Sequence, residues 1–117
     1  MEYAKLGSTE IEVSKICVGC MSFGKAGTMH DWTLDQEATE GVVKHALSLG
    51  INFFDTANAY TDSEEKIGLA LSSVRKNIFL ATKTGSSTPD QFWKHLELSL
   101  TRMKTDYIDI YQFHNPA

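Results

Sequence analysis

The sequence lacks a long hydrophobic run, a cluster of basic residues and a glycine-rich dinucleotide fingerprint. Without an apolar stretch of ~18 residues, we expect no membrane-spanning helix. Eleven Lys and Arg residues are scattered among fifteen Asp and Glu residues, and the formal net charge is −4. Because binding to nucleic acid phosphates requires clustered cations, this charge pattern disfavours a nucleic-acid partner. The missing G-x-G-x-x-G motif also disfavours a Rossmann domain.

Cysteine is also scarce, and the N-terminus lacks the basic and then apolar order of a secretory signal. We therefore expect a cytoplasmic protein in which Cys17 and Cys20 are free thiols. At 117 residues, with 42% hydrophobic and 22% charged residues, the composition is typical of one modest globular domain. We predict a single domain over residues 1–117.

The first 14 residues predict a β-hairpin, because the segments EYAKLG and IEVS flank a polar turn around Ser8, Thr9 and Glu10. Short apolar runs then alternate with helical patterns over residues 15–117. The predicted strands are 15–20, 51–56, 77–84 and 106–114. Nearly continuous apolar strands that alternate with helices are typical of parallel βαβ units in an α/β fold. The glycine- and polar-rich stretch 21–32 is a predicted loop after the first of these strands.

Three capping-box patterns predict the helix starts: Thr33 with Gln36, Asp62 with Glu65, and Thr88 with Pro89 and Gln91. Gly50 is a natural C-terminal signal for the first helix. Helical intervals predict the inward-facing residues: Ala38, Val42, Ala46 and Leu49 in the first helix, Ile67, Ala70, Leu71 and Val74 in the second, and Phe92, Leu96, Ser99 and Leu100 in the third.

Polar side chains follow the apolar runs at the strand ends. Asp55 ends the run INFFD, Tyr60 follows five residues later, Lys83 lies in LATKTG, and His114 lies in YQFHNP. Side chains alternate across a strand, so Asp55, Lys83 and His114 each share a face with inward-pointing apolar neighbours. Because parallel strands end at one edge, we expect these groups to converge there, where a (β/α)₈ barrel places its active site.

These residue types suit proton donation. A phenol, with a pKa near ~10, is a weak acid at neutral pH, and a nearby ammonium lowers that pKa. A buried ammonium in turn needs a carboxylate partner to remain charged. Asp55, Lys83 and Tyr60 therefore form a sensible proton relay, and His114 is a candidate to hydrogen-bond a substrate oxygen. Taken singly, each of the four also has an ordinary structural explanation.

The segments LGSTEIEVSKICVGCMSFG, GINFFDTANAY, SEEKIGLAL, LATKTG and DYIDIYQFHNP resemble, in this order, the aldo-keto reductase family. The resemblance covers essentially the whole chain and is nearest to bacterial members of the aryl-alcohol-dehydrogenase-like branch. It implies a TIM (β/α)₈ barrel, of which this chain supplies the N-terminal part with about four βα units. It also implies a catalytic tetrad: Asp55, Tyr60 as the proton donor, Lys83, and His114.

The resemblance further implies reduction of a small-molecule aldehyde or ketone with NADP(H) as the cofactor. Gly19, Cys20, Met21 and Asp55 match the segments that lie near the nicotinamide and its ribose in the family. A closed barrel of this type needs ~250 residues, so we expect the chain to be a fragment of such an enzyme. Unpaired strand edges and an open inner face leave an alternative, a catalytically silent half-barrel that self-associates.

The motif C-V-G-C at residues 17–20 leaves a third interpretation, a thiol–disulfide protein. A redox pair normally lies at a helix N-terminus, whereas this motif lies in a predicted strand whose geometry points Cys17 and Cys20 to opposite faces. Zinc binding is disfavoured because no second pair of ligands has a suitable spacing, and we predict no metal site. Asp109 has no partner that the sequence identifies, and its role stays open.

Overall fold

The structure, a computed structural model, describes residues 1–23, 35–60 and 62–114. The predicted hairpin is present. Strand β1 (Tyr3–Lys5) pairs antiparallel with β2 (Glu12–Ser14), and Ala4 lies opposite Val13. The predicted turn residue Thr9 closes the connection, because its Oγ1 donates to the carbonyl oxygen of Leu6 at 2.6 Å.

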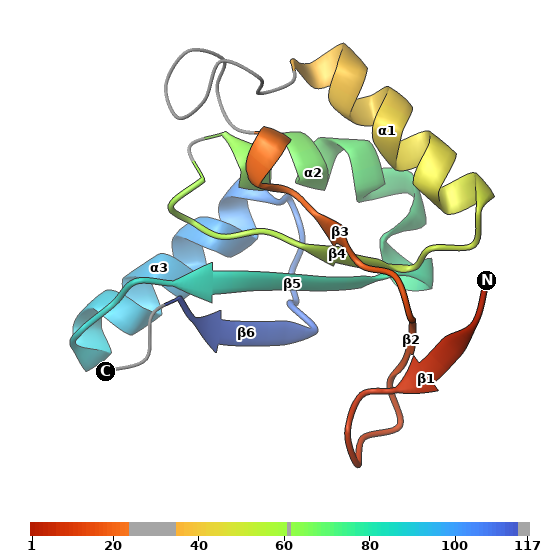
Figure 1. Ribbon diagram of the computed structural model, residues 1–117. Helices are drawn as coiled ribbons and strands as arrows, with labels where there is room; N and C mark the ends of the chain where they lie inside the picture. The colour runs from red at the N-terminus through yellow and green to blue at the C-terminus, as the bar shows by residue number, and fades with distance from the viewer. Residues whose placement is uncertain (24–34, 61, 115–117) are drawn as a thin grey trace.

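The remaining strands form one parallel sheet, as the sequence predicts. They are β3 (Val18–Gly19), β4 (Phe53–Asp55), β5 (Phe79–Thr84) and β6 (Ile110–Phe113), in the spatial order β3-β4-β5-β6. Each strand is shorter than the predicted apolar run. The sheet with its helices has the arrangement of a partial (β/α)₈ barrel, and β3 and β6 are the edges of the described sheet (Figure 1).

Three α-helices cover one face of the sheet: α1 (Gln36–Ser48), α2 (Ser63–Leu71) and α3 (Pro89–Arg102). Two short 3₁₀ helices, η1 (Met21–Phe23) and η2 (Ser72–Asn77), follow β3 and α2. Side chains of the sheet and the helices form one buried core: Cys20, Phe23, Val43, Ala46, Ile51, Phe54, Ile67, Leu71, Ile78, Leu80 and Met103. No described helix lies over the opposite face, which is turned towards the viewer in Figure 1.

Helix α1 differs from its prediction in its start and in its buried face. Its N-cap is Asp35, whose Oδ1 accepts a hydrogen bond from the Ala38 amide at 2.8 Å, while the predicted start at Thr33 lies outside the described residues. Its buried residues are Thr39, Val43 and Ala46. Val43 is 1% exposed, whereas the predicted Val42 is 42% exposed. The predicted helical period was correct and Ala46 is buried, but in the first turns the face was chosen one residue too early, and the predicted Leu49 is 53% exposed. The predicted end is confirmed, because Gly50 has a φ of +86°, which favours glycine.

The starts of α3 and α2 differ in whether the predicted capping hydrogen bond is present. In α3 the predicted Thr88 cap is confirmed, since its hydroxyl accepts from the Gln91 amide at 3.2 Å and Pro89 is the first helical residue. The Gln91 side chain, predicted to complete a capping box, accepts from the Ser87 amide at 3.0 Å. Asp62 occupies the N-cap position of α2, but its side chain makes no capping hydrogen bond, so the capping box predicted there is wrong. After α2 the chain continues as η2 through Asn77, so β5 begins two residues later than predicted.

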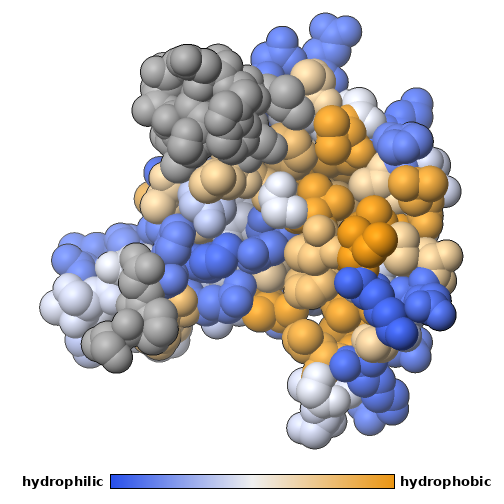
Figure 2. All heavy atoms as spheres, in the orientation of Figure 1, coloured by the Kyte–Doolittle hydropathy of each residue, from blue (hydrophilic) through white to orange (hydrophobic). Residues whose placement is uncertain are grey.

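The two faces of the sheet differ in polarity because side chains alternate along each strand. Phe54 and Leu80 point into the helix-covered core, so Asp55 and Lys83, which have the opposite parity, lie on the open face. We call this open side the inner face. Figure 2 shows hydrophilic atoms gathered at the left, where β5 and β6 end in Figure 1, and hydrophobic atoms from the centre towards the right, where further hydrophilic atoms border them.

Asn52 joins the hairpin to the start of β4. Its Oδ1 accepts from the Ser14 amide at 2.7 Å, and its Nδ2 donates to the Glu12 carbonyl oxygen at 3.1 Å. Its own amide donates to Ser14 Oγ at 3.2 Å. The hairpin is therefore fixed at the amino end of the sheet, away from the strand ends that carry Asp55 and Lys83.

Candidate active site

An ion pair lies at the carboxyl ends of two neighbouring strands. Lys83 Nζ in β5 is 2.8 Å from Asp55 Oδ2, the last residue of β4, and it also donates to the Thr56 carbonyl oxygen at 2.8 Å. Gln112 of β6 donates through Nε2 to the other carboxylate oxygen, Asp55 Oδ1, at 3.2 Å. The carboxylate is thus held from both sides, and the parallel register places Lys83 beside Gln112. The ammonium remains paired although most of its side chain is buried.

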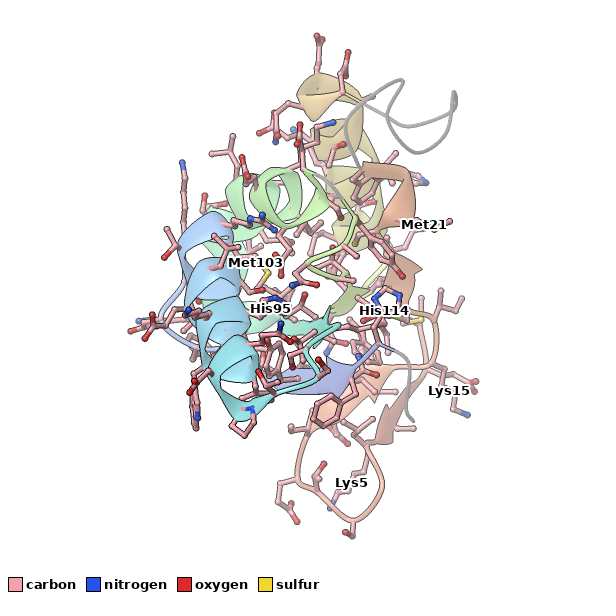
Figure 3. The ribbon with its side chains drawn as sticks, turned by 90° about the vertical axis from the view of Figure 1, so that its left-hand side faces the viewer. Lys5, Lys15, Met21, His95, Met103 and His114 are labelled. Atoms are coloured by element: carbon pink, nitrogen blue, oxygen red, sulfur yellow. The ribbon has the colours of Figure 1, made fainter. Side chains whose placement is uncertain are left out.

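Tyr60 lies above this pair and beside His114. The Tyr60 ring centroid is 5.4 Å from Lys83 Nζ. The Tyr60 and His114 rings meet edge to face, with centroids 5.4 Å apart and an interplanar angle of 89°. Figure 3 looks at the carboxyl ends of the strands and shows His114 on the inner face, on the same side as Met21. The structure therefore brings together all four side chains that the sequence placed at the strand ends.

Backbone hydrogen bonds fix the loop that carries Tyr60. The Asn58 amide donates to the Lys83 carbonyl oxygen at 3.1 Å, and the Tyr60 amide donates to the Ala57 carbonyl oxygen at 3.2 Å. The Tyr60 carbonyl in turn accepts from the Ser63 amide, the first residue of α2, at 2.9 Å. Tyr60 is thus positioned by a short, hydrogen-bonded connection between β4 and α2.

Ser63 ties this connection to β3. Its buried hydroxyl donates to the Cys20 carbonyl oxygen at 2.7 Å and lies 2.6 Å from Thr56 Oγ1. Because Ser63 has a single hydroxyl proton, Thr56 is the donor in the second contact. Neither residue was identified from the sequence, since a Ser and a Thr next to a strand end carry no pattern that distinguishes them from turn residues.

The predicted cofactor contacts occupy different environments. Gly19 ends β3 beside Asp55 and is exposed, and a Cβ built on it would meet nothing within 4 Å. Met21, in η1, is also exposed. Cys20 between them is fully buried in the core, with its amide donating to the Asp55 carbonyl oxygen at 2.8 Å. Its thiol is therefore closed to a ligand, which leaves Gly19, Met21 and Asp55 as the accessible candidates.

The cysteines lack the properties of a redox pair. Both are free; Cys17 is exposed, whereas Cys20 has no exposed surface. Desolvation by the surrounding protein and, to a smaller extent, the Asp55 carboxylate raise the pKa of the Cys17 thiol to about 11, although the Lys83 ammonium opposes this shift. Burial raises the pKa of the Cys20 thiol further. Since thiolates are the reactive species, the thiol–disulfide interpretation does not fit this pair.

Asp109, whose role the sequence left open, forms an ion pair at the opposite end of the sheet. Its Oδ2 lies 2.9 Å from Arg75 NH1 and accepts from the Leu80 amide at 2.9 Å. The Arg75 guanidinium also stacks on the Tyr107 ring, 3.9 Å from its centroid. The cluster joins η2, β5 and the segment before β6, with Arg75 and Asp109 mostly buried and Tyr107 exposed, and it is a structural element rather than part of the strand-end site.

A cavity of about 950 Å³ opens beside this cluster, lined in part by Arg75, Leu100, Lys104 and Tyr107. It contains none of the four strand-end side chains, so we do not assign the chemistry to it. In residues 1–23, 35–60 and 62–114, no group of three His, Cys, Asp or Glu side chains is placed to hold a metal ion. The described helices include none that is long and apolar enough to cross a membrane.

Comparisons with known proteins agree with this architecture. A sequence model described as the aldo/keto reductase family matches residues 15–117. The oxidoreductase YqkF of Bacillus subtilis is 35% identical over 97% of this chain and 39% of its own length. The aldo-keto reductase YhdN of the same organism is 38% identical over 99% of this chain and 38% of its own length. The chain thus spans about two fifths of these relatives.

A solved structure gives the same result in three dimensions. The holo form of the aldo-keto reductase AKR11C1 from Bacillus halodurans superposes with a TM-score of 0.86 at 32% identity. The superposition covers 100% of this chain and 41% of that structure. The half-barrel described above therefore corresponds to a portion of a longer reductase chain.

Proposed function

The chain belongs to the aldo/keto reductase family, and from this premise we propose that its strand-end site serves the NADPH-dependent reduction of a small aldehyde or ketone. One observation carries the proposal: the Lys83 ammonium lies between the Asp55 carboxylate, at 2.8 Å, and the Tyr60 ring, at 5.4 Å. A phenol beside a paired ammonium is suited to give up its proton.

Each of the four side chains has a distinct role in this proposal. The Tyr60 hydroxyl donates a proton to the carbonyl oxygen of the substrate. The Lys83 side chain stabilises the negative charge that develops on the Tyr60 oxygen, and Asp55 pairs with Lys83 and holds it in place. The His114 ring lies edge to face against the Tyr60 ring, with centroids 5.4 Å apart. In this proposal it donates a hydrogen bond to the same carbonyl oxygen and orients the substrate.

The accessible residues at the end of β3 and β4 fit a nicotinamide cofactor. Gly19 presents bare backbone next to Asp55, and Met21 offers an exposed apolar side chain. The Asp55 carboxylate, although it accepts from Lys83 and Gln112, retains acceptor capacity for a ribose hydroxyl. The hydride for the carbonyl carbon would come from NADPH held at these residues. We propose Gly19, Met21 and Asp55 as its contacts on this chain. The Cys20 side chain is not among them, because it is fully buried.

The activity of the whole protein is part of the proposal, because the chain spans 39% and 38% of the two Bacillus subtilis relatives. The test follows NADPH oxidation with a reactive aromatic aldehyde. The Tyr60→Phe variant keeps the ring but removes the proton donor, and we expect its rate to fall by ~10²–10⁴. Tyr107→Phe, which alters a tyrosine at the other end of the sheet, is the matched control and keeps the parent rate. Equal rates for Tyr60→Phe and the parent chain would reject the proposal.

A second candidate is a catalytically silent half-barrel that associates with another copy. It is favoured by the two edge strands and by the inner face, which no described helix covers. Light scattering over a range of concentrations tests it, because a dimer would dissociate on dilution whereas a monomer would keep its mass. We further propose a cytoplasmic location, which the two free thiols support.

A further inference from the structure

Arg102, the last residue of α3, reaches across to the loop that carries Tyr60. Its NH1 donates to the Asn58 carbonyl oxygen at 3.2 Å, although the two residues are 44 positions apart in the sequence. The same NH1 lies 3.3 Å from Glu64 Oε1. One guanidinium nitrogen thus contacts both the Tyr60 loop and the first turn of α2.

Glu64 is a carboxylate with no exposed surface. Burying it would be costly without partners, and both of its oxygens have one. Oε2 accepts from Thr82 Oγ1 at 2.7 Å, and Oε1 faces Arg102. Thr82 directly precedes Lys83 in β5, so the Glu64 carboxylate links Arg102 to the strand that carries the ammonium. A fixed carboxylate in this place orients the planar guanidinium.

The backbone of Asn58 is consequently held through both of its polar groups. Its amide donates to the Lys83 carbonyl oxygen at 3.1 Å, and its carbonyl oxygen accepts from Arg102 at 3.2 Å. Tyr60 follows two residues later. A general acid must stay within hydrogen-bond reach of its substrate, so small displacements of this loop affect its chemistry.

We propose that Arg102 and Glu64 are positioning residues that hold Tyr60 beside Lys83 and His114 by fixing the backbone carbonyl of Asn58. This inference rests on the proposed function, since it assigns importance to the placement of Tyr60. Neither residue contacts the strand-end side chains. Their effect is transmitted through the backbone of the β4–α2 connection.

The test measures local order in the 117-residue chain by NMR, with no carbonyl compound or NADPH present. In Arg102→Gln we expect hydrogen exchange of the Asn58 amide to accelerate at least tenfold relative to that of Leu80. We also expect the nuclear Overhauser effect between the Tyr60 and His114 rings to weaken. Because no reaction is measured, a failure of carbonyl reduction leaves this result unchanged.

The matched control is Asp109→Asn, which alters a mostly buried ion pair at the opposite end of the sheet. There the Leu80 amide loses a charged acceptor, so its exchange accelerates while Asn58 keeps its protection. If Arg102→Gln accelerates exchange at Asn58 and Leu80 equally, the pair is merely structural and the proposal is overturned. Unchanged exchange at Asn58 overturns it as well.

Two further variants keep the proposal testable if Arg102→Gln does not fold. Glu64→Gln preserves the shape of the side chain but removes the charge that orients Arg102, and it is expected to loosen Asn58 in the same selective way. Arg102→Lys keeps a cation for Glu64 but lacks the planar fork, and we expect it to restore the thermal midpoint without restoring Asn58 protection. Full recovery of both by lysine would overturn the assignment of the guanidinium as the group that fixes the Asn58 carbonyl.

Discussion

The backbone of Met103, just past the end of α3, lies directly against Gly68 in the middle of α2. A Cβ built on Gly68 would lie 2.5 Å from the Met103 carbonyl oxygen, a backbone atom that cannot rotate away. The backbone of α2, which contributes Glu64, is therefore packed directly against the residue that follows Arg102. This close approach sets the separation across which the guanidinium reaches the carboxylate.

Gly68→Ala is expected to destabilise the fold by ~1–3 kcal/mol, because the added methyl group must push α2 away from Met103. Gly41→Ala in α1 is the matched control, since a Cβ there would meet nothing within 4 Å. In that open position alanine favours the helix by up to ~1 kcal/mol. Urea denaturation of both variants checks the pair, and a shift of both midpoints in the same direction would contradict the packing described.

The two aspartates at helix N-caps should differ in their effect on stability. Asp35→Ala removes a side chain that accepts from the Ala38 amide and is expected to cost ~1 kcal/mol. Asp62→Ala removes a side chain without a capping hydrogen bond, so only a charge–dipole effect of ~0.3–1 kcal/mol is at stake. Thermal unfolding at moderate salt, which screens the dipole effect, measures the difference. Equal losses would mean that Asp62 caps α2 in solution.

Helix α1 also shows which features of the fold local sequence patterns can predict and which they cannot. The existence of α1 and its end at Gly50 were predictable, because periodicity and a C-terminal glycine are local signals. The buried face was not, since Val42 and Val43 are adjacent and either one fits an apolar stripe. Which one points inward depends on the rotation of α1 against α2 and the sheet, and that rotation is set by tertiary packing.

Asp109→Ala is expected to destabilise the protein by ~3–5 kcal/mol, because it leaves the mostly buried Arg75 guanidinium without its carboxylate. Asp106→Ala is a suitable control, since Asp106 is exposed and close in sequence, and its loss is expected to stay within ~0.5 kcal/mol. Chemical denaturation gives both values. A small effect of Asp109→Ala would show that water or another carboxylate replaces the lost partner.

Cys17 is expected to react slowly with alkylating reagents despite its exposure. Because the pKa of its thiol is raised to about 11, its thiolate fraction near pH 8 is ~100-fold lower than that of an ordinary cysteine. Mass spectrometry after timed treatment with iodoacetamide measures the rate. Alkylation as fast as that of a small thiol would contradict the environment described.

The same shift predicts the direction of a stability change at high pH. Between pH ~9 and ~11 the unfolded chain releases the Cys17 proton while the folded chain retains it. The unfolded state therefore binds fewer protons, and the free energy of unfolding falls as the pH rises through this range. Cys17→Ser removes this contribution, so comparing the two unfolding curves from pH 8 to 11 isolates it. Parallel curves would show that the shift is absent.

Lys83→Met is expected to lower kcat for carbonyl reduction at least ~100-fold, since Tyr60 loses the neighbouring ammonium. Asp55 and Lys83 form one paired unit, so Asp55→Asn combined with Lys83→Met should lose little more than Lys83→Met alone. Lys94→Met, an exposed position in α3, is the control for general effects of removing a lysine. Strictly multiplicative losses would indicate that the two residues act independently.

In the candidate site, too, the sequence predicted some residues and could not predict others. Asp55, Tyr60, Lys83 and His114 were recognisable because each is a polar residue at or just past a strand end, and strand parity is a local property. Gln112 shares that parity and carries the same signal, yet its bond to Asp55 needed the register of β5 and β6. Arg102 and Glu64 were not recognisable, because helical charges normally face solvent and their contacts depend on how closely α2 and α3 pack.

Asn52 gives the hairpin a consequence for protein engineering. With its side chain and backbone amide it makes three hydrogen bonds to Glu12 and Ser14. A chimera in which residues 1–14 are replaced by an unrelated segment would remove these partners. The Asn52 side chain and backbone amide would then lose all three hydrogen bonds. A design that transfers these βα units to another protein should therefore include β1 and β2 together with Asn52.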